Sequence, residues 1–241
     1  VSPSRILDGR KKLVKHHDLL QQVGAEYGVQ PRFIIALWAI ESDFGRFQGR
    51  HPTVESLATL GFGGRRGSFF RSELLHLLHL IEREKLIPSE LLGSWAGAMG
   101  QCQFMPSTFH KLAIDHDGDG KRDIWRNHAD IFASIANFLA HVGWREDQTW
   151  GREVQLPHNI KADTGMATKR TLAEWQLLGV RRLSGKDLPQ RNLQASLILP
   201  KRGDGRAFLV YKDFRILLKW NNSTYFALSV GKLADHLRSA G

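Results

Sequence analysis

A glutamate at the end of a strongly apolar segment is the first residue whose setting could support chemistry. Glu41 stands in the sequence Ile-Glu-Ser-Asp-Phe-Gly at residues 40–45, and on a helix it would lie above Leu37 and Trp38. An apolar helix face disfavours a charged carboxylate, so we expect the pKa of Glu41 to be raised, as a general acid requires. The alternative is a structural glutamate at a helix end that binds a nearby arginine.

The second informative segment, residues 93–107, is rich in small residues. Three glycines and two alanines in so short a stretch predict a close approach of the backbone to a ligand or to a tightly packed helix. Ser94 and Gln103 offer hydrogen bonds, and apolar faces are offered by Trp95, Met99 and Phe104. Sugars bind to such a mixture of polar groups and apolar faces. The alternative is a tight turn between two helices.

An acidic segment follows that matches the oxygen ligands of an EF-hand loop. The matching residues are Asp115, Asp117 and Asp119 at loop positions 1, 3 and 5, Gly120 at position 6 and Asp123 at position 9. Position 12, where a bidentate glutamate is expected, is Arg126, and Asp130 could supply the missing ligand from a longer loop. We therefore expect a structural Ca²⁺, with a metal-free Asp/Gly turn as the alternative. The sequence indicates no organic cofactor.

The composition sets limits on the class of protein. The chain has 241 residues, of which 42% are hydrophobic, and this fraction excludes a disordered chain and supports a large core. The longest apolar run, residues 33–40, is too short to cross a bilayer. The single cysteine, Cys102, cannot form an internal disulfide and is interpreted as a small core residue. The net charge of +10 would attract polyanions such as nucleic acid, anionic membranes or cell-wall polymers.

The elements that must position these residues are mostly helices. Apolar periodicity predicts helices at 32–40, from Ser68 to before Pro88, at 129–141 and at 225–237, and Asp8 is expected to cap a helix running through Val23. After Trp144 short segments at 153–156, 197–199 and 208–211 predict strands, with a helix near 172–178 between them. We therefore expect a helical core at 1–148, a small β-containing lobe at 149–207 and a C-terminal segment at 208–241 that returns to the core.

The motifs together resemble one known family. Residues 41–45, 93–107, 115–123, 130–138 and 220–227 closely resemble the B-type lytic murein transglycosylases. The match runs in the family's order and covers most of the chain. The resemblance implies a mainly α (α+β) fold, with a lysozyme-like helical core, a smaller β-containing lobe and an EF-hand-like loop in the core.

The resemblance also implies roles for individual residues, with Glu41 matching the catalytic acid. The implied substrate-binding residues are Ser94, Met99, Gln103, Phe104, Arg65, Arg66, Phe138, Trp220, Asn221 and Phe226. The implied metal ligands are Asp115, Asp117, Asp119, the carbonyl of Lys121 and Asp130. Three tyrosines of the family are replaced here by Phe138, Trp220 and Phe226, so the aromatic walls are kept while their hydroxyl hydrogen bonds are lost.

The mechanism that the resemblance implies uses a single carboxylic acid. Glu41 would protonate the oxygen that joins N-acetylmuramic acid to N-acetylglucosamine, and would then deprotonate the muramoyl C6 hydroxyl, which closes a 1,6-anhydro ring. Intramolecular attack gains from proximity, which explains how one carboxylate suffices. Peptidoglycan strands are the expected partner, and we expect a monomer in the bacterial periplasm. Because the chain begins Val1-Ser2, we expect a processed or trimmed chain and any membrane anchor to lie upstream.

Three other functions are weaker interpretations. A peptidoglycan-binding scaffold would keep the aromatic groove without turnover, and the presence of Glu41 argues against it. A nucleic-acid-binding domain is suggested only by the net charge, because the chain lacks a recognition-helix motif and interleaved arginine and aromatic residues. A calcium sensor usually pairs two EF-hands, whereas a single loop with three methionines in the chain indicates a structural metal.

Overall fold

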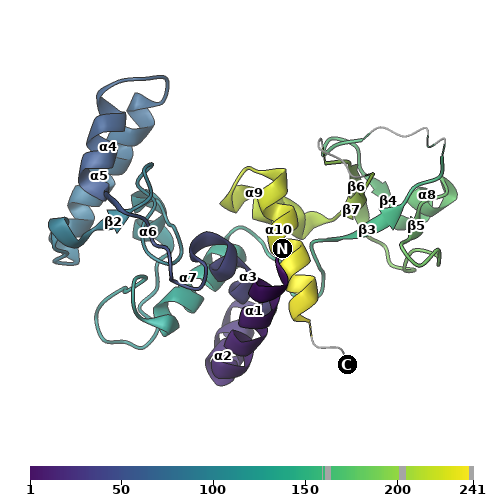
Figure 1. Ribbon diagram of the computed structural model, residues 1–241, viewed down its shortest axis with the longest axis horizontal. Coiled ribbons are helices and arrows are strands. Elements are labelled where there is room, and N and C mark those ends of the chain that lie inside the picture. The colour runs from purple at the N-terminus through teal and green to yellow at the C-terminus, as the bar shows by residue number, and fades with distance from the viewer. Residues whose placement is uncertain (159, 161–163, 201–204, 239–241) are drawn as a thin grey trace. The chain divides into compact units, whose positions relative to one another are not determined.

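The computed structural model describes residues 1–158, 160, 164–200 and 205–238 (Figure 1). The chain divides into two compact units, one formed by Val1–His141 with Leu233–Gly241 and the other by Val142–Lys232. The first unit is helical, and the second contains a five-stranded antiparallel sheet. The expected α+β class is thereby confirmed. The expected boundaries at 148/149 and 207/208 stay predictions, and the last three residues of the expected C-terminal segment lie outside the described residues.

Helices make up most of the first unit. Its elements are α1 (Pro3–Lys15), α2 (His17–Tyr27), α3 (Pro31–Ser42), β1 (His51–Pro52), α4 (Thr53–Phe62), α5 (Gly67–Arg83), the 3-10 helix η1 (Pro88–Glu90), β2 (Leu92–Gly93), α6 (Pro106–Leu112) and α7 (His128–His141). The two short strands pair antiparallel. In the part of the chain that the structure describes, no helix has both the length and the apolar character needed to cross a bilayer.

Helix α3 is the centre of the first unit. Its residues 33–39 are all fully buried, as is typical of a helix that is apolar on every side. Pro31 occupies the first turn, where its missing N–H is not needed, and Gln30 before it is extended. Helices α1, α2 and α7 pack against α3. This packing fixes the helix that carries Glu41.

Helices α4 and α5 form an antiparallel hairpin, which lies beside α6 (Figure 1). Arg71 of α5 donates a hydrogen bond from Nη1 to the carbonyl of Gly61 over 2.6 Å. The buried carboxylate of Glu73 accepts hydrogen bonds from the backbone N–H of Ser107 at 2.9 Å and from its hydroxyl at 2.7 Å. Glu73 thus satisfies a free N–H at the start of α6 and anchors the end of the segment 93–107.

The expected role of Asp8 as a helix cap is wrong. The first helix already begins at Pro3, with Ser2 as its N-cap, so Asp8 lies in the middle of α1. Ser2 and Pro3 form a stronger start signal than Asp8, because the serine hydroxyl accepts the N–H of Arg5 at 3.3 Å. Asp8 instead binds Arg46 at 2.8 Å. The expected single helix is also divided at His16 into α1 and α2.

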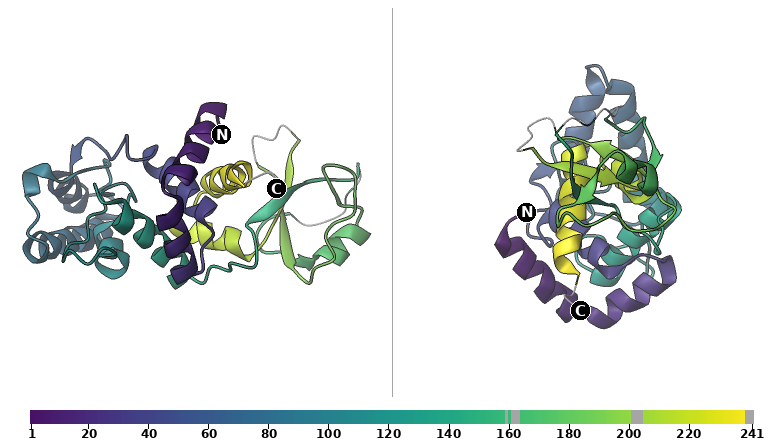
Figure 2. Two further views of the ribbon diagram at one scale, coloured as in Figure 1. Left: turned by 90° about the horizontal axis from the view of Figure 1, so that it is seen from below. Right: turned by 90° about the vertical axis from the view of Figure 1, so that its right-hand side faces the viewer.

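The second unit is built around the sheet, which Figure 2 shows from two further directions. Its elements are β3 (Gly151–Gln155), β4 (Arg170–Thr171), α8 (Leu172–Leu177), β5 (Arg181–Arg182), β6 (Gln194–Ile198), β7 (Ala207–Val210), α9 (Lys212–Trp220) and the start of α10 (Thr224–Leu237). The strand order is β4-β6-β7-β3-β5. Trp175 of α8 is fully buried on this sheet and donates from Nε1 to the carbonyl of Ala195 over 3.0 Å.

Candidate active site

The end of α3 holds Glu41 one residue before the helix stops. After Ser42 the chain turns through two non-glycine residues in the left-handed region, Asp43 with φ 48° and Phe44 with φ 60°, followed by Gly45 with φ 83°. Ser42 is buried, and its hydroxyl donates to the carbonyl of Trp38 and accepts the N–H of Gly45. Non-glycine residues adopt this conformation only where the surroundings enforce it, and such residues gather at functional sites.

Position 45 has room only for glycine, because the side chain of Gln101 packs against it. A Cβ on this residue would stand 2.3 Å from Oε1 of Gln101. The same amide oxygen accepts a hydrogen bond from Nε1 of Trp38 over 2.7 Å, and Nε2 of Gln101 donates to the carbonyl of Trp125 over 2.6 Å. Gln101 therefore joins the buried α3 to the segment that follows the acidic loop.

The glycine-rich segment, residues 93–107, folds tightly on itself and against its neighbours. Met99 and Phe104 exchange two backbone hydrogen bonds of 2.8 and 3.1 Å. The hydroxyl of Ser94 accepts the N–H groups of Ala96 and Ala98 at 3.3 and 3.0 Å. A Cβ on Gly93 would lie 2.4 Å from the carbonyl oxygen of Ala98. The close backbone approach predicted from the small residues is confirmed.

Glu41 is half-buried, and Cys102 of the glycine-rich segment is fully buried. Burial raises the pKa of the Cys102 thiol well above the usual value, with the negative charges of Glu41 and Asp130 raising it further. The interpretation of Cys102 as a core residue is confirmed. Two residues beyond Glu41, Asp43 binds Arg46 at 3.0 Å and Arg5 at 3.4 Å, so two arginines surround the turn that follows α3.

The structure brings several predicted binding residues of the first unit together in the glycine-rich segment. Ser94 and Gln103 are half-buried, whereas Met99 and Phe104 are buried. Gln103 has φ 49°, and its amide donates to the carbonyls of Gly100 and Gln48. The ring of Phe138 on α7 lies 6.0 Å from that of Phe104, centroid to centroid.

The other predicted binding residues lie elsewhere. Arg65 and Arg66 are exposed in the loop between α4 and α5, where the guanidinium of Arg66 lies 4.5 Å from the ring centroid of Phe69. Trp220, Asn221 and Phe226 belong to the second unit, at the end of α9, in the connection after it and in the first turn of α10. Ser223 ties this connection together by donating its N–H to the carbonyl of Asn221 over 2.7 Å.

Three of the predicted metal ligands gather in the acidic loop. Oxygen atoms of Asp115, Asp117 and Asp130 all lie within 4.8 Å of one another. Asp130 is fully buried, and its two oxygens each accept a backbone N–H at 2.8 Å, from His116 and from Asp123. Burial raises the pKa of Asp130, while these two N–H groups lower it and the charges of Asp117 and Asp115 raise it further. Asp130 is thus fixed and oriented by the backbone of the loop that it would complete.

The remaining acidic residues of the loop have local partners. Asp119 accepts the N–H of Lys121 at 2.8 Å and does not belong to the cluster of three carboxylates. Oδ1 of Asp123 accepts the N–H groups of Trp125 and Arg126, both at 2.9 Å. Arg126, at position 12, is exposed. A cation at this site would therefore be held first by Asp115, Asp117 and Asp130.

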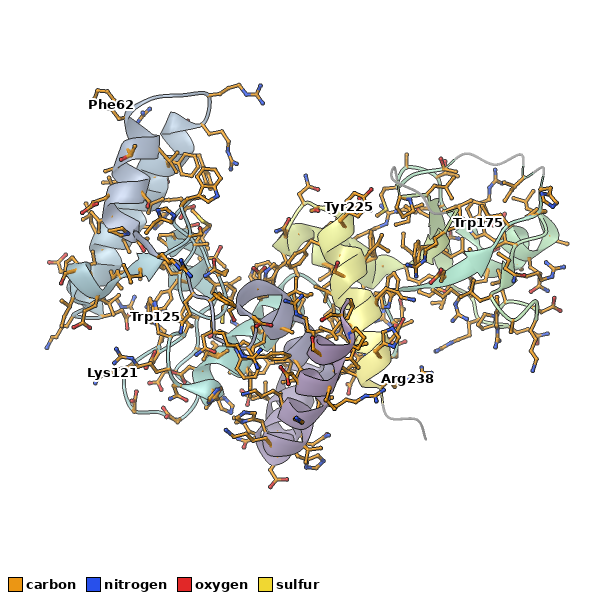
Figure 3. All side chains as sticks on the ribbon, in the orientation of Figure 1. Phe62, Lys121, Trp125, Trp175, Tyr225 and Arg238 are labelled. Carbon is orange, nitrogen blue, oxygen red and sulfur yellow. The ribbon has the colours of Figure 1, made fainter. Side chains whose placement is uncertain are left out.

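Three residues that support the site were missed by the sequence analysis, namely Gln48, Gln101 and Trp125. Trp38, Gln101, Trp125 and Gln48 form one hydrogen-bonded chain, in which Gln48 donates from Nε2 to the carbonyl of Trp125 over 3.3 Å. Trp125 lies beside the acidic loop (Figure 3). The two glutamines on either side of Cys102 were a signal for such contacts, because amides next to a buried cysteine must find partners inside the protein.

Comparison with known proteins assigns a family to this arrangement. The family described as "Transglycosylase SLT domain" matches residues 1–235. Membrane-bound lytic murein transglycosylase B of Escherichia coli (strain K12) is 31% identical over 244 residues, which cover 98% of this chain and 64% of the relative. The chain therefore spans slightly less than two thirds of the length of this curated relative.

Two solved structures are similar in fold and sequence. SltB3 from Pseudomonas aeruginosa, in complex with NAG-anhNAM-pentapeptide, is 42% identical with a TM-score of 0.94, over 99% of this chain and 64% of its own. Slt35 of Escherichia coli, in complex with calcium, is 29% identical with a TM-score of 0.87, over 98% of this chain and 75% of its own. These likenesses confirm the expected lysozyme-like fold with its small β-containing lobe. The chain belongs to the transglycosylase SLT domain family, as a member of its B-type lytic transglycosylases.

Proposed function

We propose that this chain is a peptidoglycan lytic transglycosylase, which cleaves the β-1,4 bond between N-acetylmuramic acid and N-acetylglucosamine without consuming water. The observation that carries the proposal is the setting of Glu41, half-buried at the end of a buried helix and followed within two residues by a turn in the left-handed region. The named activity of the curated relative and the sugar fragment bound to SltB3 support the same substrate class.

Glu41 acts first as an acid and then as a base. It donates its proton to the glycosidic oxygen, so that the bond from this oxygen to the muramoyl anomeric carbon breaks and N-acetylglucosamine leaves with a hydroxyl. The carboxylate then takes the proton of the muramoyl C6 hydroxyl, whose oxygen bonds to the anomeric carbon and closes the 1,6-anhydro ring. The attacking hydroxyl belongs to the same sugar, so its proximity replaces activation by a second carboxylate.

The binding roles follow from chemistry and position. Ser94 and Gln103 give hydrogen bonds to sugar hydroxyl and acetamido groups, and Met99, Phe104 and Phe138 give apolar faces. Arg65 and Arg66 are exposed cations suited to carboxylates of a stem peptide. Trp220, Asn221 and Phe226 contribute from the second unit.

Calcium is the cation that we propose for the acidic loop. Carboxylate oxygens suit this hard cation, and a buried, doubly hydrogen-bonded Asp130 beside Asp115 and Asp117 fits such a ligand set. Asp119 and the carbonyl of Lys121 would complete it, and the ion would stabilise the loop without taking part in the reaction. The calcium bound to Slt35 supports the choice of ion.

The activity points to the bacterial periplasm, where peptidoglycan lies, and we propose that the protein acts there as a monomer. The decisive experiment is mass spectrometry of purified peptidoglycan digested by the intact protein and by Glu41→Gln. We expect 1,6-anhydromuramic ends from the intact protein alone. Reducing ends would indicate a hydrolase with a second carboxylate. Tight binding without products would indicate a scaffold, and anhydro products from Glu41→Gln would exclude Glu41 as the acid.

A further inference from the structure

The net charge of the chain is concentrated in the second unit. Residues 142–232 contain sixteen lysines and arginines against eight aspartates and glutamates, whereas the rest of the chain contains eighteen against sixteen. The second unit therefore carries +8 of the formal net charge of +10. A unit with such an excess of cations attracts polyanions or anionic surfaces. The acid–base chemistry proposed for Glu41 makes no use of this charge.

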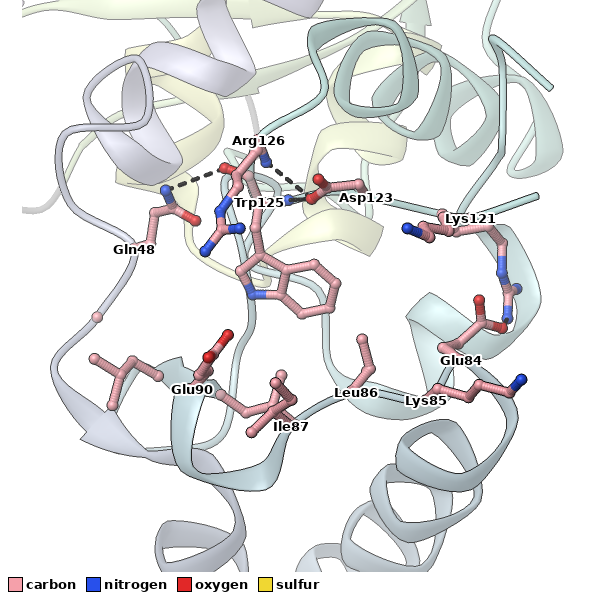
Figure 4. Close-up of a pocket in the computed structure, with 14 residues that line it drawn as sticks. Gln48, Glu84, Lys85, Leu86, Ile87, Glu90, Lys121, Asp123, Trp125 and Arg126 are labelled. Atoms are coloured by element: carbon pink, nitrogen blue, oxygen red, sulfur yellow. Dashed lines mark hydrogen bonds and ion pairs between the residues drawn. The ribbon is translucent and has the colours of Figure 1, made fainter. Parts of the chain in front are cut away.

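The first unit, in contrast, has nearly balanced charges even where it is hollow. It contains a cavity of about 540 Å³, which is shown in Figure 4. The charged residues that line this cavity are four cations, Lys85, Lys121, Arg122 and Arg126, and three carboxylates, Glu84, Glu90 and Asp123. Arg122 and Glu84 already form an ion pair. A surface that selects an anionic partner is therefore to be sought in the second unit.

One corner of the second unit combines cations with exposed apolar side chains. This corner, residues 176–188, runs from the end of α8 through β5 and the turn that follows, and Figure 1 shows α8 beside β5. Leu177 is 88% exposed and Leu183 is 52% exposed. The exposed cations of the corner are Arg182 and Lys186. Isolated exposed leucines are common, but two of them beside exposed cations form an amphipathic surface.

Hydrogen bonds hold the corner in shape before any partner binds. Arg181 donates from Nη1 to the carbonyl of Gln176 over 2.7 Å, which joins β5 to the end of α8. At the end of β5 the N–H of Arg182 donates to the carbonyl of Lys186 over 3.0 Å, so Leu183 lies in a closed turn. Both exposed leucines are therefore carried on ordered backbone, and the binding of a partner needs little further ordering of the chain.

The cations of the corner are available to an anionic partner. Arg181 is paired with Asp187 at 3.2 Å, and Asp187 is the only acidic residue of the corner. Arg182 and Lys186 are exposed and form no ion pair within the part of the chain that the structure describes. Glu174, the nearest acid before the corner in the sequence, forms the capping box at the start of α8. The corner therefore presents two unpaired positive charges.

The apolar side chains decide between the possible anionic partners. Nucleic acids and the carboxylates of peptidoglycan would bind the cations, but these polymers offer no hydrocarbon to the two leucines. A bilayer with anionic lipids offers both, because its phosphate groups attract cations and its acyl chains take apolar side chains out of water. The charge of the second unit also draws it toward such a surface.

We propose that this corner docks the second unit on a bilayer that contains anionic lipids. Leu177 and Leu183 enter the boundary between the headgroups and the acyl chains, while Arg182 and Lys186 bind lipid phosphates. The docking surface does not depend on the activity proposed for Glu41. Its consequence does rest on that activity, because cleavage would be confined to the peptidoglycan that lies beside a membrane.

Co-sedimentation with lipid vesicles, in the absence of peptidoglycan, tests the proposal. We expect saturable binding to vesicles of phosphatidylglycerol and phosphatidylcholine, weaker binding as salt is added, and little binding to phosphatidylcholine alone. Leu177→Ser and Leu183→Ser should each weaken the binding about tenfold, because each removes an apolar side chain that leaves water on docking. Arg182→Gln should weaken it about fivefold, because one attraction to the anionic surface is lost.

Leu75→Ser and Arg50→Gln are the matched controls, since both residues are exposed and belong to the first unit. They make the same replacements outside the corner and should change the affinity little. All the replaced side chains are exposed, so the variants should fold like the intact protein, which circular dichroism verifies.

The absence of binding to the mixed vesicles, or equal binding to both kinds of vesicle, would overturn the proposal. Controls that lose as much affinity as the corner variants would overturn it too. A loss in Arg182→Gln without a loss in the two leucine variants would also overturn it and would assign the corner to an anionic polymer. Anhydro product formation is measured separately, so failure of docking is distinguishable from failure of the proposed activity.

Discussion

Trp38 and Gln101 are joined by a buried hydrogen bond, in which the indole Nε1 donates to the amide Oε1 over 2.7 Å. Trp38 is fully buried in α3, and Gln101 belongs to the glycine-rich segment. This bond holds α3, which carries Glu41, to the segment that carries the predicted sugar-binding residues.

Replacing Gln101 with leucine should lower the free energy of unfolding by about 2 kcal/mol, because the indole N–H of Trp38 loses its acceptor while it stays buried. Urea denaturation measures the change. Gln21→Leu makes the same replacement at an exposed position of α2 and should change stability little. Equal midpoints for the two variants would show that the bond does not contribute.

Asp213 should make the protein less stable as the pH rises. It is fully buried, its Oδ2 has no hydrogen-bond partner among the described residues, and burial raises its pKa from 3.8 to about 7. Between about pH 4 and pH 7 the unfolded chain releases this proton while the folded chain keeps it, so stability falls across that range. Asp213→Asn should therefore stabilise the protein at pH 8, by roughly 2–4 kcal/mol.

The stabilisation by Asp213→Asn should disappear towards pH 4, which thermal unfolding at several pH values can follow. Asp187→Asn removes the charge of an exposed carboxylate in the same unit that does not contribute to the pKa shift of Asp213, and it should show little pH dependence. A gain in stability that is the same at pH 4 and pH 8 would contradict the titration of Asp213.

Glu153 should have the opposite pH dependence. It receives two hydrogen bonds of 2.6 Å from Arg206 and one of 2.9 Å from Lys232, and these partners lower its pKa to about 2. The stability that the ionised Glu153 contributes to the folded protein is fully present above about pH 4.5 and is lost as the pH falls through 2. Glu153→Gln should cost roughly 2–3 kcal/mol at pH 7 and progressively less below pH 4.5.

Acid titration of unfolding, monitored by circular dichroism, tests this prediction. Glu82→Gln, on the exposed side of α5, removes the same charge without these partners. If Glu153→Gln and Glu82→Gln behave alike, the ion pairs of Glu153 contribute nothing measurable.

Gly49 should tolerate no side chain. A Cβ there would lie 1.9 Å from the carbonyl carbon of Gly93, and φ is 102°. Gly64→Ala is the matched control, because Gly64 also has a positive φ, 92°, but open space around it. We expect Gly64→Ala to cost about 1 kcal/mol from backbone strain and Gly49→Ala more than about 3 kcal/mol from the added overlap. Urea denaturation measures the free energy of unfolding of both variants. Similar losses would mean that the backbone at Gly49 can move away from Gly93 without a loss of stability.

Calcium removal should destabilise the first unit. At a calcium concentration of 100 times the Kd, binding adds about 2.7 kcal/mol, so a chelator should lower the Tm by several degrees. Asp117→Asn should abolish this dependence, whereas Asp123→Asn should keep it, because Asp123 binds backbone N–H groups of the loop. A Tm that is insensitive to calcium in the intact protein would exclude the metal site.

Long, periodic elements could be predicted from the sequence, and those set by distant contacts could not. The helix expected at 129–141 is α7 (His128–His141), and the one at 225–237 is α10 (Thr224–Leu237), because both have a sustained apolar stripe. The strand expected at 208–211 is β7 (Ala207–Val210). In contrast, β1 and β2 have two residues each, too few for any periodicity, and form only because they lie beside each other.

The candidate site divides in the same way. Glu41 was visible from the apolar residues directly before it, and the glycine-rich segment was visible because its small residues fall within one short stretch. Gln48 and Trp125 were not, because their contact joins residues 77 positions apart in the chain. The roles assigned to Glu41, Ser94 and the other predicted groove residues stay predictions until variants are measured.

Because α3 is buried on every side, its length cannot change without moving Glu41. A helix advances by about 100° per residue, so one residue inserted between Pro31 and Glu41 would swing the glutamate to another face of the helix. The helix cannot rotate back, because residues 33–39 are all enclosed by its neighbours and the turn at Asp43 fixes its end. Relatives and engineered variants that keep the activity should therefore preserve the spacing of this segment even where its side chains differ.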